Sequence, residues 1–189
     1  RADRGGKTGP DGAFAVTSPS IADRVAAFAS EGRVFLHSDA ASHSYLDLQE
    51  LALRHAGWWA LHGDRVAFGG TNALDLAAWA LAAEVKGRTL VILPSAQAPA
   101  VMADRAKDSG ASHLVGTTAD PVALQKGSAL SRLAGLWPKG RKGVVALDPD
   151  QRPPFAVLFT SGSQGKPKGV LWSHRAVTAH LETYRRTLS

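Results

Sequence analysis

The 189-residue sequence contains no cysteine, which excludes disulfide bonds, thiolate-bound metals and cysteine nucleophiles. A chain without cysteine fits the reducing cytoplasm, and we expect the protein to be located there. The seven histidines are scattered, and none falls in an H-E-x-x-H pattern. His174 and His180 are six residues apart, a spacing that places them on different faces of a helix. We therefore expect no metal site built from protein side chains.

Long hydrophobic runs are also missing. A membrane-spanning helix needs about 18 or more consecutive apolar residues, and no such stretch occurs. The most apolar segment, residues 73–85, is too short and is interrupted by Asp75. No secretory hydrophobic region follows the first residue, Arg1. We expect no membrane span, and because Arg1 is not a methionine we expect the beginning of the gene product to be missing.

Basic residues outnumber acidic ones, which gives a formal net charge of +6 and a pI of about 10.0. Such a charge is typical of nucleic-acid-binding proteins. The basic residues are dispersed, however, and form only short groups at residues 139–142, 166–168 and 185–186. No aromatic residues are interleaved with them, as a base-stacking surface would require. The pattern favours a solvated basic surface and no nucleic-acid partner.

Helix-like and strand-like segments alternate along most of the chain. Apolar residues three and four positions apart predict helices, and short apolar runs predict strands buried on both faces. Repeated alternation predicts an α/β fold with a mostly parallel sheet flanked by helices. A short strand pair is predicted at residues 33–39 and 41–48, ahead of the alternating part. The predicted helices are residues 18–32, 46–63, 71–87, 98–110, 119–127 and 173–189, and the predicted strands are residues 64–70, 88–94, 112–116, 143–147, 155–160 and 169–173.

The domain organisation follows from composition. Residues 1–19 are largely Gly-rich and polar and are predicted to form a loose amino-terminal segment. Residues 20–189 are long enough for one domain with its own core. Within it, residues 127–154 are rich in Gly, Pro and basic residues and are interpreted as a linker or surface excursion.

Two local signals need interpretation. Asp120 and Pro121 suit the cap and first position of a helix, which supports the helix predicted at residues 119–127.

The run F-G-G-T-N at residues 68–72 lacks the G-x-G-x-x-G dinucleotide fingerprint. We interpret it as a tight turn followed by a helix cap at Thr71 or Asn72.

The most informative stretch is T-S-G-S-Q-G-K-P-K-G, residues 160–169, which follows an apolar strand-like run. Its glycines allow close approach of the backbone to a ligand, and successive backbone N–H groups in such a loop can bind an anion. Its hydroxyls add hydrogen-bond donors and its lysines add positive charge, so the loop is suited to a polyphosphate. A Walker A loop is excluded because Lys166 is followed by Pro167, where Ser or Thr is required, and because the next segment is strand-like.

Residues 160–170, T-S-G-S-Q-G-K-P-K-G-V, resemble the phosphate-binding signature of the adenylate-forming (AMP-binding) enzymes. This family includes acyl-CoA synthetases, aryl-CoA ligases, luciferases and peptide-synthetase adenylation domains. Its typical run is T-S-G-[ST]-[ST]-G-x-P-K-G-V, and only Gln164 departs from it. Upstream residues resemble the family's opening pattern of a Tyr-x-x-Leu helix, a Gly-Asp-Arg-Val strand and an Asn turn. These residues are Tyr45, Leu48, Gly63, Asp64, Arg65, Val66 and Asn72.

The resemblance implies the amino-terminal portion of an ATP-dependent acid:thiol ligase. In this family a small carboxylic acid attacks the α-phosphate of Mg²⁺-bound ATP and pyrophosphate leaves. The acyl-adenylate then passes to the thiol of CoA or of a carrier protein. Family members are much longer than this chain, and their adenine-contacting run, their ribose-contacting Asp and their catalytic lysine follow the part matched here. We therefore expect no catalytic residue in this chain and no adenylation by this chain alone.

Within the loop, the resemblance assigns Lys168 as the main cation for the β- and γ-phosphates. Lys166 occupies the variable position of the signature, and a long flexible side chain there is expected to be mostly solvated. The predicted ATP phosphate-binding residues are Thr160, Ser161, Gly162, Ser163, Gln164, Gly165, Lys166 and Lys168.

Three alternatives remain at this stage. The chain could be a ligase portion, a truncated nucleotide- or phosphate-binding module without catalysis, or a basic nucleic-acid-binding domain. A sheet that ends within a domain exposes an edge and an apolar face, which predicts self-association or a partner. The helices that contain Trp58, Trp59 and Trp79 are the predicted surface, and ordinary core packing is the alternative for these side chains.

Overall fold

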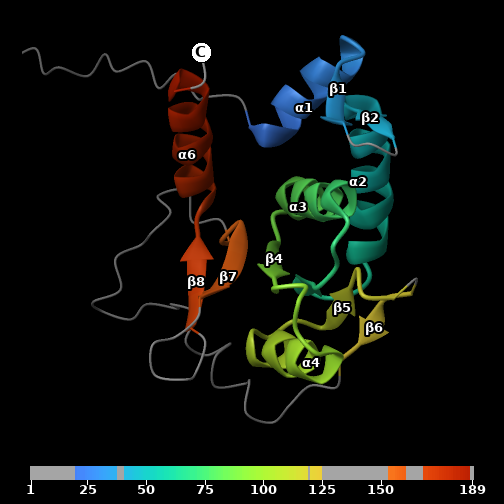
Figure 1. The fold of residues 1–189 in the computed structure, drawn as a ribbon, viewed down its shortest axis with the longest axis vertical. Coiled ribbons are helices and arrows are strands. Elements are labelled where there is room, and N and C mark those ends of the chain that lie inside the picture. Colours follow the sequence, from blue (N-terminus) through green and yellow to red (C-terminus); the bar gives the residue numbers. More distant parts are fainter. Residues whose placement is uncertain (1–19, 38–40, 119, 125–152, 161–167, 188–189) are drawn as a thin grey trace, which may run out of the picture.

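The computed structural model describes residues 20–37, 41–118, 120–124, 153–160 and 168–187. This part of the chain contains a six-stranded sheet, a separate two-stranded sheet and helices around them (Figure 1). The strands are β1 (Val34–His37), β2 (Ser42–Ser44), β3 (Arg65–Phe68), β4 (Thr89–Ile92), β5 (His113–Val115), β6 (Val122–Ala123), β7 (Ala156–Thr160) and β8 (Lys168–Trp172). The helices are α1 (Ile21–Ser30), α2 (Tyr45–Trp59), α3 (Ala73–Lys86), α4 (Pro99–Asp108) and α6 (His174–Thr187).

The large sheet is mostly parallel. Its strand order is β6-β5-β3-β4-β7-β8, and the four inner strands run in the same direction. β6 and β8 are edge strands that pair antiparallel to β5 and β7. The predicted α/β fold with a mostly parallel sheet flanked by helices is therefore confirmed. The predicted strand pair near the amino terminus is confirmed in part: β1 and β2 are antiparallel partners, but residues 45–48 of the second predicted strand begin α2 instead.

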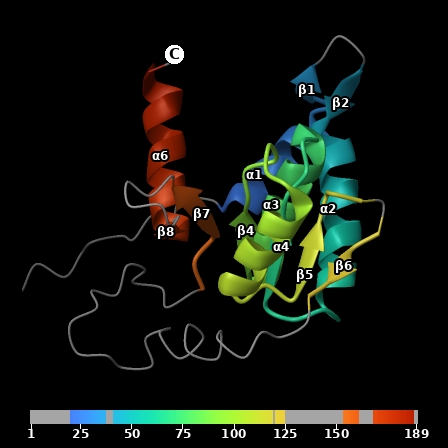
Figure 2. The same ribbon diagram turned by 60° about the horizontal axis from the view of Figure 1, so that its bottom comes forward.

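Helices cover both faces of the sheet. One face packs against α2 and α3, where Phe68 and Leu90 of the sheet meet Trp59 and Trp79 of the helices. The other face packs against α4 through a second cluster that includes Met102. Figure 2 shows β5 between α2 and α4, in agreement with these two clusters. Continuous apolar strands with both faces covered are the arrangement expected of a parallel sheet.

A third helix layer lies outside α2 and α3. α1 packs there through a cluster formed by Val25, Leu48 and Leu81 with neighbouring alanines. α1 and α2 each begin with a capping box, in which a serine hydroxyl and an aspartate satisfy each other's backbone N–H groups. These boxes explain why both helices start where they do. Ser20 pairs with Asp23, and Ser44 pairs with Asp47.

Two of the three tryptophans considered above belong to the core. Trp59 and Trp79 are 0% and 4% exposed, and their rings contact each other with centroids 5.6 Å apart. Trp58 is partly buried and packs against the same cluster. The interpretation of Trp59 and Trp79 as core residues is confirmed, and self-association stays a prediction.

The helix predicted at residues 119–127 is wrong in the part that the structure describes. Val122 and Ala123 form β6, and Leu124 N donates to Ser112 O at 2.8 Å, which extends the pairing with β5. The open edge of β5 offers backbone partners to this segment, and the β-branched Val122 suits a strand. Tertiary pairing therefore overrides the local helix-start signal of Asp120 and Pro121.

Some predictions fall on parts outside the described residues. These are the loose segment 1–19, the strand at 143–147 and all of the linker 127–154 except its last two residues. Within the described residues, no helix is long and apolar enough to cross a membrane.

Candidate functional site

The candidate site lies where four parallel strands end. In the sheet register, Phe68 at the end of β3 pairs with Ile92 of β4 and with Val115 of β5. Ile92 in turn pairs with Leu158 of β7, two residues before Thr160. The segment that follows β7 therefore leaves the sheet at the same edge as the turns that follow β3, β4 and β5. In open α/β sheets, ligands bind outside this carboxyl edge.

The predicted phosphate loop connects two paired strands at this edge. β7 and β8 form an antiparallel hairpin in which Thr160 pairs with Lys168 and Phe159 pairs with Gly169. The register thus brings together the two ends of the loop, which are also two of its predicted ligand residues. The other predicted site residues lie outside the described part of the chain: Ser161, Gly162, Ser163, Gln164, Gly165 and Lys166.

Buried contacts hold the base of the hairpin. Val157 is 5% exposed and belongs to the cluster beneath α4, and Phe159 packs against that cluster. The Thr89 hydroxyl, on the neighbouring strand, donates to Pro154 O at 2.7 Å within the protein interior. A Cβ at Gly169 would lie 3.2 Å from Val157 Cγ1. The space between β8 and β7 at this position therefore suits glycine, which has no side chain. The loop therefore starts and ends on a buried, hydrogen-bonded base.

The turn after β3 packs tightly against the turn after β5. A Cβ at Gly70 would lie 2.5 Å from Gly116 O, so the turn after β3 and the turn after β5 touch through backbone atoms. Gly116 itself has a φ of +80°, which favours glycine. Asn72 Oδ1 accepts from Asp75 N at 3.0 Å and caps α3. The interpretation of residues 68–72 as a tight turn and a helix cap is confirmed, with Asn72 as the cap.

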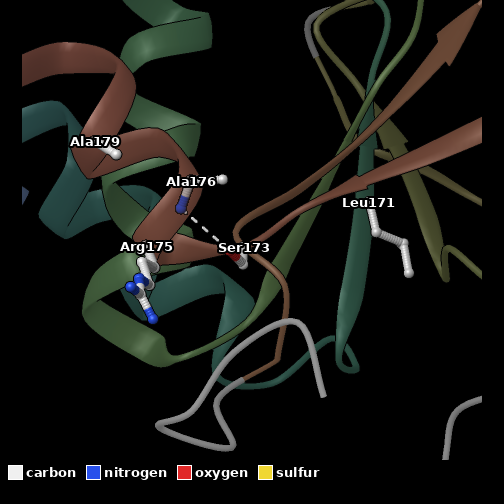
Figure 3. A pocket seen from close by; sticks show the side chains of 5 residues that line it. All are labelled: Leu171, Ser173, Arg175, Ala176 and Ala179. Carbon is white, nitrogen blue, oxygen red and sulfur yellow. Dashed lines mark hydrogen bonds between the residues drawn. The ribbon is translucent and has the colours of Figure 1, made fainter. Parts of the chain in front are cut away.

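A second candidate feature is a hollow at the start of α6. Ser173 Oγ accepts from Ala176 N at 3.1 Å, so Ser173 caps α6 (Figure 3). The hollow beside this cap has a volume of about 370 Å³. It lies at the far end of β8 from Lys168, because β8 runs from Lys168 to Trp172 away from the loop. The residues that line it are Leu171, Ser173, Arg175, Ala176 and Ala179.

Titratable groups gather at the opposite, amino edge of the sheet. His113 begins β5, and its ring lies edge-on to the His62 ring with centroids 5.1 Å apart. Burial disfavours the charged imidazolium and lowers the pKa of His113, and the nearby His62 lowers it further. Burial also lowers the pKa of Arg65, which begins β3 and donates to Ser109 O at 2.8 Å. These contacts stabilise the amino edge of the sheet, which is the edge opposite the predicted loop.

Sequence reasoning missed the ion pairs between distant elements, which include Arg24 with Glu182 and His55 with Asp75. His55 Nε2 lies 2.7 Å from Asp75 Oδ1, and the His55 ring stacks on Trp79 at 4.0 Å between centroids. The pair joins α2 to the first turn of α3, so its role is to position two helices. No local spacing signals a contact between residues so far apart in the chain. Within the described residues, no group of three or more His, Cys, Asp or Glu side chains could hold a metal ion.

Comparisons with known proteins identify a family whose model matches this sequence and solved structures that share its fold. A family model described as AMP-binding enzyme matches residues 23–188. The chain is similar to the inhibitor-bound N-terminal domain of FACL13 from Mycobacterium tuberculosis, with a TM-score of 0.59 and 21% identity over 84% of this chain and 45% of that one. It is also similar to the NpsA N-terminal subdomain from Klebsiella oxytoca in complex with 3-hydroxyanthranilyl-AMSN, with a TM-score of 0.57 and 26% identity over 82% and 41%.

A third solved structure shares the fold. It is the O-succinylbenzoate coenzyme A synthetase MenE from Bacillus subtilis in complex with AMP, with a TM-score of 0.53 and 19% identity over 77% of this chain and 40% of that one. The chain thus spans less than half the length of each of these three structures.

Proposed function

This chain belongs to the AMP-binding enzyme family, and from this premise we propose that it forms part of an ATP-dependent acid:thiol ligase. One observation carries the proposal. The run that resembles the family's phosphate-binding signature begins and ends on the β7–β8 hairpin, at the carboxyl edge of four parallel strands. An anion-binding loop at that edge has its backbone donors anchored by a buried sheet.

The proposed reaction has two steps. A carboxylate oxygen of the acid attacks the α-phosphorus of ATP, the bond to the oxygen that bridges the α- and β-phosphates breaks, and pyrophosphate leaves. A thiol then attacks the acyl carbon, its proton is released, and AMP leaves as the thioester forms. The acid is a small molecule, and the thiol belongs to CoA or to a carrier protein.

The loop acts on the leaving group in the first step. Negative charge builds on pyrophosphate as the bond breaks, and preorganised donors near that charge lower the barrier. We assign the backbone N–H groups of residues 161–165, the hydroxyls of Thr160, Ser161 and Ser163 and the ammonium of Lys168 to this task. Gln164 retains a side-chain donor where the family has a hydroxyl. Lys166 is assigned a solvated position.

Mg²⁺ enters the proposal with the nucleotide. The ion is usually bound by substrate phosphates together with few protein ligands. The described residues include no group of three or more His, Cys, Asp or Glu side chains that could hold a metal ion, and most of the predicted loop lies outside them. When bound, the ion would neutralise phosphate charge during the first step.

We further propose that the 189-residue chain binds the triphosphate but does not complete adenylation by itself. The support is its coverage of less than half of each related structure named above. The same coverage favours the second candidate function, a nucleotide- or phosphate-binding module without catalysis. The absence of cysteine supports a cytoplasmic location for either function.

ATP–pyrophosphate exchange, measured with the full gene product and a panel of carboxylic acids, separates the two candidates. A ligase shows exchange that depends on one class of acid. A binding module shows no exchange with any acid and still binds ATP in calorimetry. Nucleic-acid binding would instead show a steep salt dependence and no preference for ATP over pyrophosphate.

A further inference from the structure

The outer face of α2 and of the turn after it carries three exposed leucines, with Glu50 and Gly57 between them. Leu46, Glu50, Leu53, Gly57 and Leu61 recur at steps of four, three, four and four residues, so they share one side of the helix and of the turn after it. Leu46, Leu53 and Leu61 are 49%, 59% and 82% exposed. We call these five residues the α2 stripe.

The stripe is separate from the core-facing side of the same helix. Leu48, Ala52, Ala56 and Trp59 are buried against α1, α3 and the sheet. Single exposed leucines are common on soluble proteins, but three of them on one side of the same helix and the turn after it form a candidate interaction surface. α2 also lies on the side of the molecule opposite α6 in both views of the fold (Figures 1 and 2).

We propose that the α2 stripe binds the same stripe of a second copy of this chain, in an antiparallel pair around a two-fold axis at Leu53. Leu46 lies seven residues before Leu53, about 10 Å along the helix. Leu61 lies eight residues after Leu53, in the turn that follows the end of α2 at Trp59. An antiparallel partner therefore places its Leu61 beside Leu46, and the two Leu53 side chains meet at the axis. The surface is complementary to itself, as a two-fold interface requires.

The charged residues near the proposed axis support a second copy of this chain as the partner. Glu50 lies three residues before the axis, and Arg54 lies one residue after it. In the antiparallel pair, Glu50 therefore approaches Arg54 of the partner subunit, and the symmetry repeats this contact. Neither side chain takes part in an ion pair within the residues that the structure describes.

Gly57 is consistent with close approach of two helices. Among the described residues, a Cβ placed there would meet nothing within 4 Å. Glycine inside a helix costs about 1 kcal/mol relative to alanine, and no contact within the described part of the chain explains it. In the pair, Gly57 lies opposite Glu50 and lets the two backbones come together.

The edge formed by β8 and α6 is a less suitable surface for a second copy. Leu171, Leu181 and Tyr184 are exposed there. Exposed basic residues of α6, including Arg175 and Arg186, accompany them, and a two-fold axis would bring these like charges together.

The first test compares two matched substitutions, Leu53→Glu on the α2 stripe and Leu181→Glu on α6. Both leucines are exposed on helices, so both variants are expected to fold, and thermal melts of each check this. Sedimentation equilibrium of the full chain should show a reversible dimer for the unmodified protein and for Leu181→Glu. Leu53→Glu should raise the dimer Kd by about 100-fold or more, because a central interface residue is lost from both subunits.

The second test exchanges charges without removing apolar contacts. Glu50→Arg and Arg54→Glu should each weaken the dimer, because each places like charges across the axis. The double variant should restore it toward the original Kd. A monomer at every concentration up to about 100 µM would overturn the proposal, since it excludes a dimer with a Kd in the micromolar range. Dissociation by Leu181→Glu but not by Leu53→Glu would also overturn it, as would a double variant that stays as weak as the single ones.

Discussion

Replacing Thr89 by valine should weaken the attachment of the β7–β8 hairpin to the sheet. Thr89 is 2% exposed, and its hydroxyl donates to Pro154 O at 2.7 Å, just before β7 begins. Valine keeps the shape of the side chain and its strand preference but removes the donor. The substitution therefore deletes one hydrogen bond and leaves a buried carbonyl without this partner, which costs about 1–3 kcal/mol. For a chain of this length, that loss corresponds to a decrease in Tm of about 2–12 °C.

The matched control is Thr183→Val on α6. The Thr183 hydroxyl also donates to a backbone carbonyl, Ala179 O at 3.0 Å, but this contact is exposed to solvent. Water can replace the donor there, so the change in unfolding free energy should stay within about 0.5 kcal/mol. Urea and thermal unfolding measure both variants. Equal losses at the two positions, or no loss at Thr89, would refute the assignment of the buried bond as an anchor of the hairpin.

Two further predictions concern packing and pH. Gly70→Ala should destabilise the chain much more than Gly169→Ala, because the added Cβ would lie 2.5 Å from Gly116 O at the first position but 3.2 Å from a methyl group of Val157 at the second. Similar midpoints in urea for the two variants would contradict this ranking. The lowered pKa of His113 means that the unfolded chain, with a pKa near 6.5, binds a proton before the folded chain as the pH falls. Stability should therefore be fully present above pH 6.5 and decrease below it, and His113→Gln should lose less stability than the unmodified protein between pH about 7.5 and about 5.5. Parallel pH profiles for the two proteins would exclude this contribution.

Local signals in the sequence predicted the elements of this fold well. Asn72, one of the two residues predicted to cap α3, acts through its side chain on a backbone group three residues away, so a short window contains the information. Ser20 and Ser44 cap α1 and α2 in the same way, although they were not predicted as caps. The inner strands are short apolar runs between turn residues, and their alternation with helices predicts a parallel sheet. The two strands that flank the predicted phosphate loop were expected as apolar runs, but their antiparallel pairing was not.

Contacts between distant residues could not be predicted in this way. β6 forms because the edge of β5 is open, and the competing helix-start signal of Asp120 and Pro121 loses to that pairing. The contact between His55 and Asp75 depends on how α2 packs on α3. Local propensity carries no information on such packing, so these features became visible only in the assembled fold.

The most direct test of the central claim compares two lysines of the same loop in the full gene product. Lys168→Ala should lower kcat/KM for ATP in acyl-adenylate formation by about 100-fold or more, as expected when a donor to the developing negative charge is lost. Lys166→Ala, at the solvated position, should change it by no more than a few-fold. Equal effects of the two substitutions, or full activity of Lys168→Ala, would contradict the claim that this loop holds the leaving pyrophosphate.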